Sequence, residues 1–177
     1  LVRSRGLGDV YKRQALTESG RMLRSTLTTL NPAVLDHHGL GVALTELGAS
    51  AVGRHGPRVA VDTAGWVGDT PTPVDALLYA TARELLANVL KHAHAERVEM
   101  TAEYTGGQAR LVVLDDGTGF TEDDALRIPE RLAQGHLGLA SRRVRLEAAG
   151  GSLTVGARPG GGTVAVATVP LRLDAAG

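Results

Sequence analysis

The strongest helical pattern in the sequence lies between Val74 and Ala93. Its apolar residues recur every three or four positions and cover one broad face of an α-helix: Leu78, Ala82, Leu85, Leu86, Val89 and Ala93. A helix of this kind has to bury that face against a second layer. Two strand-like runs follow it, residues 97–104 and 109–114, and the turn Thr105-Gly106-Gly107-Gln108 between them predicts a hairpin.

The other periodic segments extend the same arrangement. Helices are expected at about 41–54 and 137–149, and strands at 58–64, 152–157 and 163–170. Helices and antiparallel strands are mixed without strict βαβ alternation. The pattern therefore favours an α+β two-layer sandwich over a doubly wound fold.

The composition excludes several classes of protein. Nineteen basic and nineteen acidic side chains cancel, which argues against a protein that coats a duplex or a membrane surface. There is no cysteine, which excludes disulfide scaffolds and thiolate metal sites. Apolar runs fall far short of the ~20 residues of a membrane span, and no signal peptide is recognisable. We expect a soluble, cytoplasmic single domain. Residues 1–14 lack periodicity and are expected to be foreign to the fold.

The polar face of helix 74–93 carries the first candidate chemistry. Glu84, Asn88, Lys91, His92 and Thr81 fall within roughly a third of the helix circumference. The amide oxygen of Asn88 can bind a hard cation such as Mg²⁺, Lys91 can neutralise a phosphate, and Glu84 can act as a base. The alternative is a solvated helix face on which a glutamate and a lysine pair.

Two glycine-rich segments could hold a ligand. The turn Asp115-Asp116-Gly117-Thr118-Gly119 follows a buried-looking strand, where a carboxylate can accept a hydrogen bond from an exocyclic amine. A simple hairpin or a calcium-like loop remains an alternative there, although the spacing does not fit an EF-hand. Gly135-His136-Leu137-Gly138 opens the next helix, whose N-terminus can bind an anion. Neither a Rossmann fingerprint nor a P-loop is present.

Taken in order, these segments resemble the sensor histidine kinases of two-component systems, in particular the NarX/DesK-type subgroup. ARELLANVLKHAHA resembles the N box, LDDGTGF the G1 box and GHLGLASRRVRLEAAGG the G2 box. GSLTVGARPGGGTVAVATVP resembles the closing strands of their ATP-binding domain, and LNPAVLDHHGL the linker before it. The resemblance spans about Ala15 to Pro170. It implies a Bergerat ATP-binding fold, with a mixed sheet and helices on one face, preceded by part of a dimerisation helix.

The resemblance also implies a role for each motif residue. At the phosphate end, Asn88 would hold Mg²⁺, Glu84 would be the base or orient water, and Lys91 and His92 would face the phosphates of ATP. At the adenine end, Asp115 would accept a hydrogen bond from the amino group. The remaining positions would shape the pocket and its lid, residues 120–134: Gly117, Gly119 and Thr163 around adenine, and Gly135 and Gly138 at the hinge of the lid.

The implied organisation has five parts. Residues 1–14 are foreign, 15–31 end a dimerisation helix, 32–40 form the linker, 41–171 form the ATPase domain and 172–177 form a tail. The partners implied are ATP, a response regulator receiver domain and a second copy bound through upstream helices, without nucleic acid. The intact protein could be anchored in the cytoplasmic membrane by an upstream region.

The sequence departs from the subgroup in two respects. Ser141 and Arg142 stand where Gly-Met is usual, and Val144 stands where Glu is usual. No box with a phosphoacceptor histidine is present, and His37 and His38 in the linker are poor candidates. The chain is therefore expected to bind nucleotide without phosphorylating itself. Two alternatives stay open: an anti-sigma-type serine kinase on the same fold, and a non-catalytic binding module.

Overall fold

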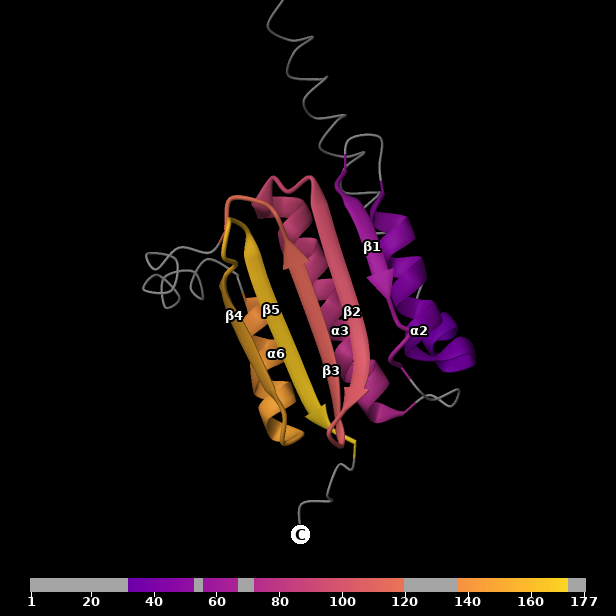
Figure 1. Cartoon of the computed structure of the whole chain (residues 1–177). Helices are drawn as coiled ribbons and strands as arrows, with labels where there is room; N and C mark the ends of the chain where they lie inside the picture. The colour runs from indigo at the N-terminus through magenta and orange to yellow at the C-terminus, as the bar shows by residue number, and fades with distance from the viewer. Residues whose placement is uncertain (1–31, 53–55, 67–71, 120–136, 172–177) are drawn as a thin grey trace, which may run out of the picture.

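The computed structural model describes residues 32–52, 56–66, 72–119 and 137–171. They form two layers, a five-stranded sheet and a layer of helices that covers one of its faces (Figure 1). The helices are α2 (Pro32–Ala51), α3 (Pro73–Asn88), the π-helical turn η1 (Val89–Ala93) and α6 (Leu137–Ala148). The strands are β1 (Arg58–Asp62), β2 (Arg97–Thr105), β3 (Gln108–Asp115), β4 (Ser152–Ala157) and β5 (Thr163–Pro170). The expected α+β sandwich is confirmed.

The sheet is mixed, in the order β1-β2-β3-β5-β4. Strand β1 pairs with β2 in parallel, and every other neighbouring pair is antiparallel. The β2–β3 hairpin turns at Gly106 and Gly107, whose φ angles are 60° and 80°. Two consecutive residues with positive φ give the turn the twist that a tight hairpin needs, which explains the glycine pair.

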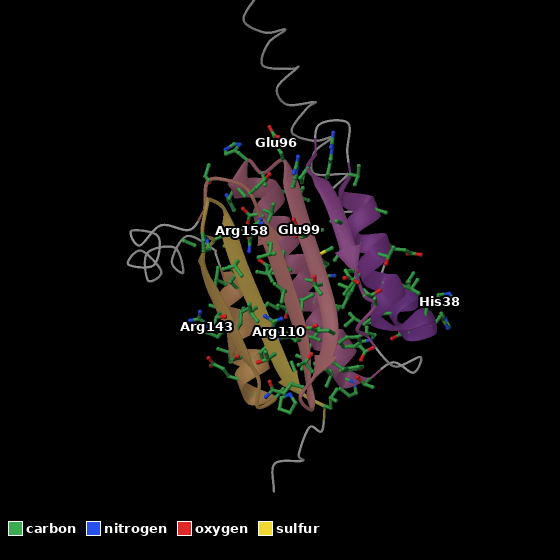
Figure 2. The ribbon with its side chains drawn as sticks, in the orientation of Figure 1. His38, Glu96, Glu99, Arg110, Arg143 and Arg158 are labelled. Carbon is green, nitrogen blue, oxygen red and sulfur yellow. The ribbon has the colours of Figure 1, made fainter. Side chains whose placement is uncertain are left out.

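Alternation along the central strands separates a buried face from an open one. Leu111 and Val113 are buried under the helices, together with Asp115 at the end of β3. The opposite face carries half-exposed residues and an ion pair between Arg110 and Glu103, whose Nη1 and Oε1 atoms are 2.9 Å apart. Figure 2 shows Arg110 on this open face. Because side chains alternate with period two, Asp115 points into the interface between the sheet and the helices.

Three elements differ from the sequence expectation. The helix expected from Gly41 begins earlier, at Pro32, so the expected linker 32–40 is helical up to a kink at Gly39, where φ is 73°. The strand expected to reach Ala64 ends at Asp62, whose Oδ1 accepts a hydrogen bond from the Ala64 amide at 2.9 Å and starts a turn. The single helix expected over 74–93 is an α-helix followed by a π-helical turn.

The terminal segments expected to be foreign sequence, the end of a dimerisation helix and a tail (1–14, 15–31 and 172–177) lie outside the described residues. Helix α2 packs against β1 at one edge of the sheet, and α6 packs against β4 at the other, with α3 between them (Figure 1). None of the helices described here combines the length and the apolar character needed to cross a bilayer.

Candidate active site

Helix α3 and its extension η1 carry four of the candidate residues, and α3 is capped at its N-terminus. Thr72 caps α3 by accepting a hydrogen bond from the Asp75 amide, and Pro73 begins the first turn. Glu84 and Asn88 lie one turn apart on α3 and are half-exposed. The helix then widens into η1, which presents Lys91 and His92 at the surface. Such π-helical turns occur frequently at functional sites.

One residue of the predicted polar face does not belong to it. Thr81 is 1% exposed, and its hydroxyl donates to the Leu77 carbonyl oxygen at 2.8 Å. The prediction that it shares the solvated face was wrong, because the contact surface of α3 is wider than its apolar stripe. The alternative, a glutamate and a lysine that pair on a solvated face, is not observed either, because Glu84 and Lys91 form no ion pair among the described residues.

The Asp115 carboxylate is held by backbone amides at the end of β3. The side chain is 4% exposed, and its Oδ1 accepts hydrogen bonds from Gly117 N at 2.9 Å and Thr163 N at 3.3 Å. Both amides bond to the same oxygen. Among the described residues, Oδ2 accepts no hydrogen bond and is available to a donor on a ligand. Thr163 thus reaches the predicted site through its backbone.

Gly117 brings the strand end and the helix end together. A Cβ atom placed on it would lie 2.2 Å from the carbonyl oxygen of Ala93, the last residue of η1. That same oxygen accepts a hydrogen bond from Thr118 N at 2.8 Å. Only a residue without a side chain permits this approach. The turn with Asp115 therefore sits directly on the end of the helix that carries Asn88, Lys91 and His92.

A second close backbone approach involves Gly162, which the sequence analysis did not single out. Its φ is +90°, and a Cβ atom there would lie 1.9 Å from the Asp115 carbonyl oxygen. Gly119, at φ +80°, packs against Gly162 in turn, with a built Cβ 3.0 Å from its carbonyl oxygen. The run of three glycines before β5 was the available signal, but a turn explained it equally well.

Asp116, the second aspartate of the turn, has a different task. Its Oδ1 accepts hydrogen bonds from Glu96 N and Arg97 N, each at 2.8 Å, and so ties the turn to the start of β2. The Arg97 amide above all lowers the pKa of this exposed carboxyl; desolvation opposes it, and the Glu96 amide lowers the pKa further. From the sequence, Asp115 was the aspartate expected to recognise a ligand, and Asp116 had no expected role.

The G2 segment reaches the site through Gly138. A Cβ atom built on Gly138 would lie 1.9 Å from Oε1 of Glu84, so the carboxylate rests against the first turn of α6. The negative charge is favourable there because the N-terminus of a helix carries a partial positive charge. Gly135 and the expected lid, 120–134, lie outside the described residues.

The side chains near Asn88 determine which kind of metal site the chain can offer. Within the described residues no group of three or more His, Cys, Asp or Glu side chains converges. That part of the chain therefore offers no cluster of carboxylate, imidazole or thiolate ligands for a cation. Mg²⁺ fits nonetheless, because it usually keeps waters and is shared between one or two protein oxygens and the phosphates of a substrate. Asn88 offers such an oxygen beside two basic side chains.

The comparisons agree with this geometry. Residues 74–173 match the family model described as histidine kinase-, DNA gyrase B- and HSP90-like ATPase, more than half of the chain. The chain therefore belongs to this family of ATPases. Within it, the relatives identify an ATP-binding catalytic domain of NarX-type sensor histidine kinases.

Two curated relatives and two solved structures illustrate the likeness. The sensor histidine kinase NarS of Mycobacterium tuberculosis is 38% identical over 89% of this chain, and the nitrate/nitrite sensor NarX of Escherichia coli is 32% identical over 88%. These stretches are 35% and 25% of the relatives' lengths, so the chain spans about a third or less of them.

Among solved structures, the histidine kinase domain of the blue-light activated kinase of Erythrobacter litoralis EL346 has a TM-score of 0.60 at 29% identity. The match covers 75% of this chain and 61% of that one. Full-length ShkA, solved in complex with AMPPNP, has a TM-score of 0.62 at 26% identity, covering 75% of this chain and 29% of that one. These matches cover the two-layer fold, which confirms the Bergerat arrangement expected from the sequence.

Proposed function

We propose that the chain binds MgATP with adenine at Asp115 and the phosphates at Asn88, Lys91 and His92. The observation that carries the proposal is the fixed Asp115 carboxylate, whose Oδ1 is saturated by two backbone amides while Oδ2 is left to a ligand. An exocyclic amino group is the complementary donor. The hydrogen bond from Thr118 N to the Ala93 carbonyl oxygen holds the Asp115 turn against the basic end of η1, which supports phosphate binding there.

The phosphate end combines charge with an oxygen donor. Lys91 and His92 are exposed at the end of η1 and can neutralise phosphate oxygens. Asn88, half-exposed one turn before them, would hold Mg²⁺ through its amide oxygen. Bound Mg²⁺ would supply charge neutralisation on the phosphates. Glu84, one turn earlier, would then face the terminal phosphoryl group.

In the intact protein the transfer would run from ATP to a histidine. The bond between the γ-phosphorus and the bridging oxygen breaks, ADP leaves, and a phosphorus–nitrogen bond forms to the imidazole, whose N–H proton Glu84 can accept. His37 and His38 lie on α2, which packs against β1 at one edge of the sheet, whereas Gly138 lies on α6, which packs against β4 at the other edge (Figure 1). This supports an acceptor outside the described chain, on dimerisation helices shared with a second copy, and relay to a response regulator.

A calorimetric titration of the full chain with ATP, with and without Mg²⁺, tests the binding proposal. In Asp115→Asn, the amide nitrogen can replace the accepting Oδ2 and face the amino group of adenine, so ATP binding should weaken at least tenfold. Asp116→Asn is the matched control, because that side chain faces the β2 backbone, and it should bind like the parent. Asn88→Ala should remove the effect of Mg²⁺. Unchanged binding by Asp115→Asn would overturn the assignment of adenine.

A further inference from the structure

Arg142 is half-buried on α6 and is not among the residues to which the proposed function assigns a role. Its Nε–H group is fully enclosed and makes no hydrogen bond within the described residues. A buried donor without a partner is costly, so such a group calls for an explanation. Burial lowers the pKa of this guanidinium, and so do Arg145 and Arg83, whereas Glu84 raises it.

The geometry of α6 directs Arg142 toward Glu84. Side chains on an α-helix lean toward its N-terminus, so a residue covers the turn that precedes it. The residue one turn before Arg142 is Gly138, which has no side chain and against which the Glu84 carboxylate rests. Arg142 and Glu84 therefore share one stretch of the contact between α3 and α6.

The charge of this stretch is unbalanced. The guanidinium groups of Arg145 and Arg83 each lie close enough to act on Arg142, and among the described residues Glu84 is the one carboxylate that acts on it with the opposite sign. Two positive charges are left over. The ion pair recorded in the described chain, Arg110 with Glu103, lies on the open face of the sheet and neutralises none of them. A surplus of this kind favours an anion with several charges, and guanidinium groups suit phosphate oxygens.

We propose that Arg142 is a further binding residue for the terminal phosphoryl group of ATP, and that it makes the site prefer a nucleoside triphosphate over a diphosphate. The inference rests on the proposed function, which puts that group beside Glu84. The terminal N–H groups of the guanidinium would donate to the phosphoryl oxygens, and the negative charge of the phosphoryl group would offset the surplus positive charge. Where the subgroup usually has methionine, this chain has a cation at the γ-phosphate.

The test compares ATP with ADP on the full chain by calorimetry in Mg²⁺. Arg142→Met keeps an unbranched side chain of similar length and removes the charge. Arg142→Lys keeps the charge without the planar donor group. The matched control is Arg143→Met, because Arg143 is exposed on the same helix and projects outward at the edge of the molecule (Figure 2). Thermal unfolding of each variant reports on the fold.

The proposal expects Arg142→Met to weaken ATP about tenfold and to change ADP affinity less than twofold. Arg142→Lys should recover part of the loss, and Arg143→Met should bind both nucleotides like the parent. Equal weakening of ATP and ADP, or no change in either, would overturn the role of Arg142. If the parent binds neither nucleotide, the proposed function fails first, and the inference fails with it.

Discussion

Replacing Gly117 by alanine should move the turn that carries Asp115 away from the end of η1. The added Cβ would lie 2.2 Å from the Ala93 carbonyl oxygen, where the nearest comfortable carbon–oxygen contact is about 3.3 Å. The obstructing atom belongs to the backbone, so the turn and the helix end have to move apart by about 1 Å. That movement breaks the Thr118–Ala93 hydrogen bond and pulls Gly117 N out of hydrogen-bond range of Asp115.

Two hydrogen bonds, one of them to a charged group, are worth about 2–4 kcal/mol together. Gly117→Ala should therefore lower the free energy of unfolding in urea by that amount. ATP should bind at least tenfold more weakly, since Asp115 loses one of its two amide donors. Gly156→Ala is the control, because a Cβ atom there meets nothing within 4 Å, and it should leave stability and binding unchanged. A Gly117→Ala protein as stable as the control, with parental ATP affinity, would refute this reasoning.

Two further predictions address other contacts of the site. Gly138→Ala should raise helix stability by up to about 1 kcal/mol, yet it displaces the Glu84 carboxylate, a side-chain end that can move. The free energy of unfolding in urea should not fall, while the rate of phosphoryl transfer, assayed with the dimerisation helices restored, should fall at least tenfold. A variant that transfers phosphoryl groups at the parental rate would contradict a role for the contact between Gly138 and Glu84. Asp116 has a lowered pKa, so its stabilisation is complete above the ordinary aspartate pKa and disappears as pH falls through the folded-state value. The unfolding midpoint of Asp116→Asn should thus fall less than the parent's between pH 5 and pH 2, and equal declines would exclude this role.

Much of the fold follows from local patterns. The period-two alternation of residues 152–157 and 163–170 predicted β4 and β5 with the bounds that the structure has. The same alternation puts Asp115 on the buried face of β3, next to Val113, without any knowledge of what covers it. Periods of 2 and 3.6 residues reflect backbone geometry, which each segment carries in its own sequence.

Local sequence patterns did not predict the π-helical conformation at the end of α3. Residues 89–93 continue the apolar pattern of α3, and the pattern is compatible with both an α-helical and a π-helical turn. The burial of Thr81 likewise depends on the neighbours that pack over α3. A helical period reports which side is apolar, but the width of the contact is decided by the elements that cover it.

The sequence by itself therefore determined the order of the elements, the motifs and the alternation of buried and open faces along the strands. Only the tertiary structure decided what lies against each glycine of the site. Gly117 faces Ala93, Gly162 faces Asp115 and Gly138 faces Glu84, and each partner is distant in the chain. A glycine has no side chain whose pattern could reveal such a contact, so its necessity depends entirely on what folding brings opposite it.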